Sequence, residues 1–209
     1  MHLIHQYYYF KSALSPKSCD DIIAHAKNQK EQIGIIGSTK KNVKLLKKDL
    51  LNLKKVRDSN VVWLNDQWIY NLIHPYVHQA NKDAGWNFQW DWSESCQFTK
   101  YKLNQHYDWH CDSYERPYKD SQHTEFNGKI RKLSVTCSLS DPSDYKGGEL
   151  EFNFNVPNKT KKHNIVKCKE ILPRGSIVVF PSHVWHRVCS VKKGTRYSLV
   201  MWNLGHPFR

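Results

Sequence analysis

The 209-residue sequence predicts a mainly β, α+β fold in which an antiparallel barrel or sandwich is backed by N-terminal helices. Two observations support this prediction. Up to Gly85 the apolar residues recur at helical spacing, and after Gly85 they alternate with polar residues as they do in strands. The length and the 39% hydrophobic content suit one core. We therefore expect a single domain over residues 1–209, with helical support over roughly 12–84 and a barrel over roughly 86–205.

The first predicted helix begins at Ser15 and Pro16. A serine hydroxyl can accept a hydrogen bond from the first turn of a helix, and a proline at the first helical position loses no backbone hydrogen bond. Apolar residues between positions 19 and 26 then follow at helical spacing, which supports a helix over this stretch.

A second helix is predicted to begin at Asn65-Asp66, with an apolar stripe over residues 68–80. Pro75 lies inside the stripe and lacks a backbone N–H, so we expect the helix to kink or break there. Before this helix, residues 40–57 carry eight basic side chains against the single acidic residue Asp49, with five leucines interleaved. This segment is predicted to be either a basic amphipathic helix or a mobile surface segment.

Strand-like segments follow one another after Gly85. In residues 131–139, apolar residues alternate strictly with serines and a threonine, which predicts a strand with one polar face. Residues 158–163 are polar and basic, and they predict a hairpin loop. The predicted strands span residues 86–92, 95–103, 105–110, 131–139, 149–155, 177–180 and 195–202.

The chain is strongly basic, with 32 Lys and Arg against 19 Asp and Glu, a formal net charge of +13. Such an excess favours an acidic partner, either nucleic acid or an anionic substrate. No stretch approaches 18 consecutive apolar residues, so we expect no transmembrane segment. The first residues lack a basic region followed by an apolar one, and the six cysteines are scattered without a CxxC pair. We therefore expect no signal peptide, reduced thiols and a cytoplasmic location.

Residues 106–112 carry a metal-binding pattern, His-Tyr-Asp-Trp-His-Cys-Asp. Positions i and i+2 of a strand point to the same side, so a His-x-Asp pair presents an imidazole and a carboxylate together. With a second histidine, such a pair suits Fe(II) and leaves coordination positions open. The segment holds two copies of the same parity, His106-x-Asp108 and His110-x-Asp112, and periodicity does not choose between them. The distant histidine is His183 or His186.

Six motifs lie in order between Tyr101 and Trp202. They are Tyr-Asp-Trp-His-Cys-Asp (107–112), Arg-Lys-Leu-Ser-Val-Thr-Cys-Ser-Leu-Ser (131–140), Tyr-Lys-Gly-Gly-Glu-Leu (145–150), Pro-Arg-Gly-Ser-Ile-Val-Val-Phe-Pro (173–181), His-Arg-Val (186–188) and Gly-Thr-Arg-Tyr-Ser (194–198). In their order and spacing, this stretch resembles the iron(II)/2-oxoglutarate-dependent dioxygenases, specifically the prolyl 4-hydroxylase-like (PKHD-type) group. The resemblance implies a double-stranded β-helix, a jelly-roll or cupin-like barrel, with the metal at one mouth.

The resemblance also implies the metal ligands. It selects His110 and Asp112 over the first copy of the pair, and His186 as the distant histidine. His106 and His183 then become groups that lie outside the ligands or at the surface. Asp112 fills the coordination position that halogenases of this fold leave to halide, so the resemblance implies hydroxylation.

For the cosubstrate 2-oxoglutarate (2OG), the resemblance implies Arg196 as the partner of the distal carboxylate. Arginine offers a planar, permanently charged fork, and Ser198 shares its strand face. Tyr101 is the matching hydroxyl donor, and Gln97 and Thr99 share its face. Ser138 stands where some relatives place a second tyrosine, and it is too short to reach the carboxylate directly. The expected 2OG-binding residues are Arg196, Tyr101, Ser198, Trp202, Thr136, Leu150 and Val188.

The reaction implied is hydroxylation of an unactivated C–H, most simply of a prolyl (or lysyl) residue in a peptide or protein, with 2OG converted to succinate and CO2. Fe(II), 2OG and O2 are required, and ascorbate is a further cofactor that the resemblance suggests. Arg131, Tyr114 and Arg116 are expected on the substrate side. Two alternatives stay open, a demethylase-type oxygenase acting on nucleic acid and a non-catalytic binding module. The oligomeric state also stays open.

Overall fold

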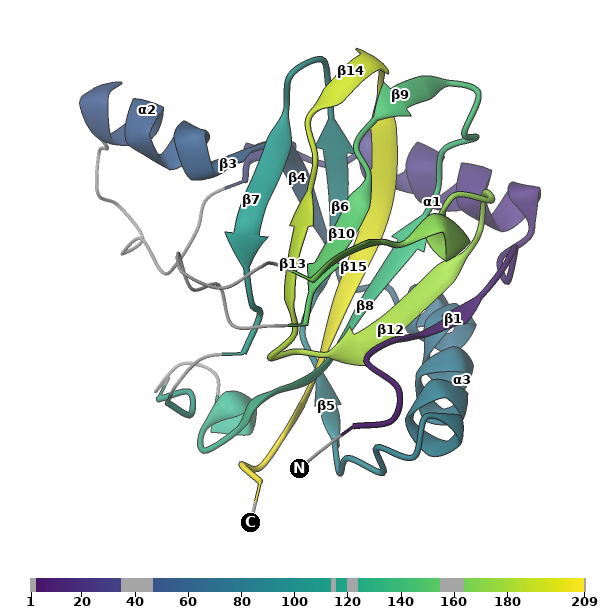
Figure 1. Ribbon diagram of the computed structural model, residues 1–209, viewed down its shortest axis with the longest axis vertical. Coiled ribbons are helices and arrows are strands. Elements are labelled where there is room, and N and C mark those ends of the chain that lie inside the picture. Colours follow the sequence, from purple (N-terminus) through teal and green to yellow (C-terminus); the bar gives the residue numbers. More distant parts are fainter. Residues whose placement is uncertain (1–2, 35–46, 114–115, 120–123, 155–163, 209) are drawn as a thin grey trace.

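The computed structural model describes residues 3–34, 47–113, 116–119, 124–154 and 164–208. Two antiparallel sheets face each other, and two of the helices pack behind the larger sheet (Figure 1). This arrangement is a double-stranded β-helix, so the expected mainly β, α+β class is confirmed.

The larger sheet has eight strands and forms the back wall of the barrel. Its longest strands, β8 and β15, lie side by side at the centre and place Ser198 opposite Ser138. In spatial order the strands are β1 (Tyr8–Phe10), β12 (Ile177–Pro181), β8 (Ile130–Ser138), β15 (Arg196–Gly205), β6 (Cys96–Tyr101), β4 (Asn60–Leu64) and β2 (Gln32–Ile33), and β5 (Trp92–Ser93) also pairs with β15.

The smaller sheet forms the front wall and carries both histidines of the expected metal site. Its spatial order is β11 (Ile165–Lys167), β10 (Leu150–Asn153), β13 (Trp185–Val188), β7 (His106–His110) and β3 (Arg57–Asp58). A separate pair, β14 (Val191–Gly194) and β9 (Tyr145–Gly147), caps one end of the barrel (Figure 1). Short 3-10 turns span Thr124–Phe126 and Lys169–Ile171.

Two of the three helices found in the described residues, α1 (Pro16–Lys27) and α3 (Gln67–Asp83), bury their apolar faces against the outer side of the larger sheet. The hydroxyl of Ser15 accepts a hydrogen bond from the backbone N–H of Ser18 at 3.0 Å, which confirms the predicted start of α1. The third helix, α2 (Lys47–Val56), extends away from the barrel beside β3 (Figure 1). Its presence supports the amphipathic-helix reading for that part of residues 40–57, and residues 40–46 lie outside the described residues.

Strand β8 shows how the sequence pattern positions the site. The apolar side chains of Leu133, Val135 and Cys137 are buried in the core shared with α1 and α3. The alternating residues on the other side of the strand, Ser134, Thr136 and Ser138, are buried as well. A strand buried on both sides with one polar face indicates that this face meets a polar interior, which is the pocket described below.

Two expectations about local structure need correction. Helix α3 does not break at Pro75, because Ile73 and Val77 on either side of it are fully buried in the core and hold the helix together, and the alternative of a kink stays a prediction. Residues 86–91 form no strand. The Asn81 side chain at the end of α3 instead donates to the carbonyl of Phe88 and accepts from its N–H, which pins this stretch to the helix.

The N-terminal part of the chain also contributes more than helical support. Strands β2, β3 and β4 all lie within residues 12–84, and β1 precedes them, so both sheets are completed by this half. The predicted hairpin loop at 158–163 lies outside the described residues. Among the described helices, none combines the length and the apolar character needed to cross a membrane.

Candidate metal centre

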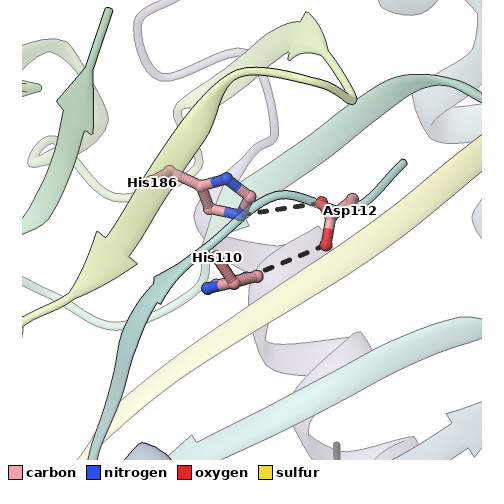
Figure 2. A group of neighbouring side chains, drawn as sticks. All are labelled: His110, Asp112 and His186. Atoms are coloured by element: carbon pink, nitrogen blue, oxygen red, sulfur yellow. Dashed lines mark ion pairs between the residues drawn. The ribbon is translucent and has the colours of Figure 1, made fainter. Parts of the chain in front are cut away.

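Three side chains, two of them on strands β7 and β13, meet inside the barrel (Figure 2). Antiparallel pairing of β7 with β13 places His110 directly opposite His186, and Asp112 follows β7 by two residues. One donor atom from each residue lies within 4.8 Å of the other two. The Nε2 atoms of His110 and His186 lie 3.8 Å and 3.6 Å from the carboxylate oxygens of Asp112.

A β-bulge in β7 decides which His-x-Asp copy faces the interior. His110 pairs with His186 and Tyr107 pairs with Val188, so β7 has one more residue than β13 over this stretch. The side chain of Asp108 accepts a hydrogen bond from the N–H of Trp109 at 2.8 Å within this irregular stretch. As a result His110 points inward, whereas His106 lies at the edge and contacts the carbonyl of Lys55.

Asp112 is fixed by hydrogen bonds after the chain leaves β7. Its backbone N–H and that of Ser113 both donate to the carbonyl of Ser182 at 2.9 Å. The hydroxyl of Ser134 on β8 donates to Oδ2 of Asp112 at 2.7 Å and also contacts the hydroxyl of Ser182 at 2.9 Å. Residues on or next to strands of the larger sheet therefore fix Asp112, and its other carboxylate oxygen faces His110.

Backbone carbonyls orient both imidazoles. Nδ1 of His110 lies 2.8 Å from the carbonyl of Asp108, and Nδ1 of His186 lies 3.0 Å from the carbonyl of Val184. A carbonyl can only accept, so Nδ1 carries the proton in each ring and Nε2 has a free lone pair. This arrangement is typical of histidines that bind metal ions.

The protonation states also suit metal binding. Burial, together with the neighbouring His186, lowers the pKa of His110 to about 3. Burial raises the pKa of Asp112, but the nearby His186, His110 and Arg131 and the bond from Ser134 outweigh it and bring the pKa to about 2. At neutral pH the site therefore presents a neutral imidazole from His110 beside an ionised carboxylate.

A pocket opens beside the three side chains, and the expected 2OG-binding residues all line it. Arg196 at its far end is 2% exposed, donates to the hydroxyl of Ser198 at 3.2 Å and has no carboxylate partner among the described residues. The expected residues lining the pocket are Arg196, Tyr101, Ser198, Trp202, Thr136, Leu150 and Val188, together with Gln97 and Thr99, and Val200 also lines it.

Of the residues expected on the substrate side, Arg131 and Arg116 stand outside this lining. Arg131 makes a two-pronged ion pair with Glu94, at 2.7 Å and 2.5 Å, and stacks on the ring of Trp202 at 4.0 Å. Arg131 thus supports the pocket wall from behind. Arg116 is exposed, and Tyr114 lies outside the described residues. His183 is exposed, as expected for a surface histidine.

Sequence reasoning missed two polar residues of the pocket, Arg57 and Tyr107. Arg57 ends a run of basic residues that is typical of a charged surface, yet it is only 6% exposed. Tyr107 lies three positions before His110, which in a regular strand puts the two on opposite faces. The bulge brings them to the same side, and no pattern in the sequence predicts this bulge.

Comparisons with known proteins agree with this geometry. Residues 96–203, about half of the chain, match the model of the 2OG-Fe(II) oxygenase superfamily. The chain is 38% identical over 106 residues to the PKHD-type hydroxylase YbiX of Escherichia coli O1:K1, an alignment that covers 50% of this chain and 40% of the relative. The chain thus spans well under two thirds of the length of that relative.

Two solved structures are similar in fold over nearly the whole chain. One is the viral collagen prolyl hydroxylase of Paramecium bursaria Chlorella virus-1 in complex with 2OG, with a TM-score of 0.62, 19% identity and 97% of both chains covered. The other is a prolyl hydroxylase of Trichoplax adhaerens in complex with a peptide fragment of hypoxia inducible factor, with a TM-score of 0.64, 17% identity, and 96% and 84% of the chains covered.

Proposed function

The chain belongs to the 2OG-Fe(II) oxygenase superfamily, and on that premise we propose that it is an Fe(II)- and 2OG-dependent dioxygenase acting on a peptide or protein. It hydroxylates an unactivated C–H of a prolyl (or lysyl) residue and converts 2OG to succinate and CO2. One observation carries the proposal: two imidazoles, a carboxylate and a buried guanidinium without an acidic partner among the described residues share one pocket.

Fe(II) would be held by Nε2 of His110, Nε2 of His186 and the carboxylate of Asp112. The donor set fits this ion, because two neutral nitrogens and one charged oxygen leave coordination positions for a cosubstrate. The bound iron would supply the activation of O2. The protein contributes the orientation of the ligands, through the carbonyls of Asp108 and Val184 and the hydroxyl of Ser134.

2OG would lie between the metal ligands and Arg196. The guanidinium of Arg196 and the hydroxyl of Ser198 can hold one carboxylate between them. The phenol of Tyr101 is fully enclosed, and burial raises its pKa, so it stays a neutral donor facing the same space. Leu150, Val188 and Trp202 would form the apolar walls that keep water away from the reacting groups.

A peptide substrate is supported by the similar structure that was solved with a peptide fragment. Aromatic side chains extend the wall of the pocket toward solvent, because Trp63 is 43% exposed and lies 6.2 Å from the ring of Trp202. The buried cysteines Cys19, Cys96, Cys137 and Cys168 are free thiols, which supports a reducing, cytoplasmic setting in which iron stays ferrous. Ascorbate would return iron to that state after an uncoupled turnover.

The alternative of a nucleic-acid substrate depends on basic residues reaching the pocket mouth. The exposed lysines Lys146, Lys192 and Lys193 lie on β9 and β14, at the end of the barrel opposite the end of β7 that carries His110 (Figure 1). Strands β9 and β14 therefore place no basic side chains around His110, Asp112 and His186. The other alternative, a non-catalytic module, gives no reason for all four polar groups of the site to be retained together.

The proposal is tested by incubating the iron-loaded protein with 2OG in air and with pools of proline-containing peptides or of oligonucleotides. We expect succinate to form in proportion to peptide that gains one oxygen atom, and both products to vanish when iron or 2OG is left out. Oxygen added to oligonucleotides alone would favour the demethylase-type alternative. Absence of succinate with every pool, from protein that binds iron, would favour the binding module.

A further inference from the structure

The ring of Tyr107 lies flat against one of the expected metal ligands. Its centroid is 3.5 Å from that of the His110 imidazole, and the two planes differ by 12°. The β-bulge described above creates this contact, since a regular strand would separate the two side chains. A bulge next to a functional site often serves to re-aim a side chain.

The stack supplies a constraint that the hydrogen bond of His110 does not. The bond from Nδ1 to the carbonyl of Asp108 directs one edge of the ring but leaves it free to tilt about that axis. His186 has the same kind of bond, and its tilt is limited by the ring of Phe180, whose centroid is 4.7 Å away at 65°. For His110 the tilt is limited by the stacked ring of Tyr107.

Tyr107 is itself held by Arg57, its cross-strand partner in the pairing of β3 with β7. The guanidinium carbon of Arg57 lies 4.5 Å from the centre of the Tyr107 ring. The guanidinium donates to the side-chain oxygen of Gln97 at 2.6 Å and to the hydroxyl of Ser59 at 3.0 Å. Among the described residues it has no carboxylate partner. Burying a cation without such a partner costs free energy, and the contacts with Tyr107, Gln97 and Ser59 offset that cost.

Gly34 shows how closely this guanidinium is seated. A Cβ atom at Gly34 would lie 2.3 Å from the hydroxyl of Ser59 and 3.0 Å from Nε of Arg57. The backbone N–H of Gly34 also donates to the carbonyl of Ser59 at 2.9 Å. The backbone at residue 34 therefore packs directly against Ser59 and Arg57 and leaves no room for a side chain.

We propose that Arg57 and Tyr107 are positioning residues that fix the plane of the His110 imidazole and thereby set the affinity and geometry of the metal centre. This inference rests on the proposed role of His110, Asp112 and His186 as metal ligands. An imidazole that donates to a metal ion becomes poorer in electrons, and an electron-rich phenol ring stacks on it more favourably. Metal binding and stacking therefore strengthen each other.

The test is titration of the metal-free protein with Co(II), whose absorption bands report both affinity and coordination geometry. Tyr107→Leu removes the ring, and we expect it to weaken Co(II) binding by about tenfold or more and to alter the band shape. Tyr107→Phe keeps the ring, and we expect it to show the Co(II) affinity and band shape of the wild-type protein. Trp109→Leu is the matched control, because it removes a ring from the same strand that contacts Arg187 instead of a ligand.

Arg57 is tested by a double-mutant cycle. Arg57→Met alone should weaken Co(II) binding, and adding it to Tyr107→Leu should cause little further loss, because Arg57 acts through Tyr107. Gly34→Ala disturbs the same guanidinium without changing its chemistry, and it should shift the Co(II) bands in the same direction. Circular dichroism of each metal-free variant separates these effects from misfolding.

Several outcomes would overturn the inference. If Tyr107→Leu kept the wild-type Co(II) affinity and band shape, the Tyr107 ring would have no part in positioning His110. An equal loss in Tyr107→Phe would assign the effect to the hydroxyl. Unchanged Co(II) binding in Arg57→Met, with a raised requirement for 2OG or substrate, would make Arg57 a ligand-binding residue. Failure of the wild-type protein to bind Co(II), or binding that survives Asp112→Ala, would instead contradict the proposed function.

Discussion

Asp112→Ala is expected to abolish metal binding and 2OG turnover. The substitution removes the charged donor from a buried site and leaves two neutral imidazoles to hold a dication. Loss of a group that merely orients a ligand costs about 10- to 100-fold in metal affinity, and loss of the ligand itself should cost more. Titration of the metal-free protein with Fe(II) without oxygen, followed by a succinate assay, measures both effects.

The matched control is His106→Ala, which alters the other His-x-Asp copy at the edge of β7. We expect it to keep the metal affinity and succinate formation of the wild-type protein. Coupled turnover at the wild-type rate in Asp112→Ala would contradict the assignment of the carboxylate ligand. If only His106→Ala lost metal binding and succinate formation, the metal ligands would be His106 and Asp108 instead.

Arg196→Ala is expected to raise the concentration of 2OG needed for turnover steeply. Removing one partner of a buried, hydrogen-bonded charge pair costs about 2–5 kcal/mol, which is at least about 30-fold in affinity. Metal affinity should change little, since Arg196 lies at the far end of the pocket from the triad. The 2OG dependence of succinate formation, measured beside Co(II) affinity, separates the two roles.

Ser198→Ala serves as a graded comparison, because it removes the hydroxyl beside Arg196 but keeps the charge. It should raise the 2OG requirement by less than the arginine variant does. An unchanged 2OG requirement in Arg196→Ala would contradict the proposed binding mode. A parallel loss of Co(II) affinity in that variant would show that the pocket had been disrupted as a whole.

Much of the fold could be predicted because local signals and burial agree. The serine cap and proline of α1 mark the start of a helix whose apolar face is buried, and the alternation in β8 separates a core face from a pocket face. The six motifs between Tyr101 and Trp202 led to the resemblance, which the family match confirms. The ligand and cosubstrate roles taken from it remain predictions, although the structure brings those side chains into one pocket.

The errors share a physical cause, because tertiary contacts override local rules. Pro75 does not break α3, since buried neighbours on both sides hold the helix. Residues 86–91 have strand-like composition, but the backbone of Phe88 forms hydrogen bonds with the side chain of Asn81. Arg57 and Tyr107 enter the pocket only through a short strand pairing and a bulge, features that depend on residues far apart in sequence.

The central claim is that His110, Asp112 and His186 hold Fe(II) with 2OG anchored on Arg196. Its most direct test is a crystal structure of the protein loaded with Fe(II) and 2OG in the absence of oxygen. The account predicts one metal ion bound by both Nε2 atoms and the carboxylate, and the distal carboxylate of 2OG on the guanidinium of Arg196. Iron bound away from these three side chains, or 2OG anchored on Arg57 instead, would contradict it.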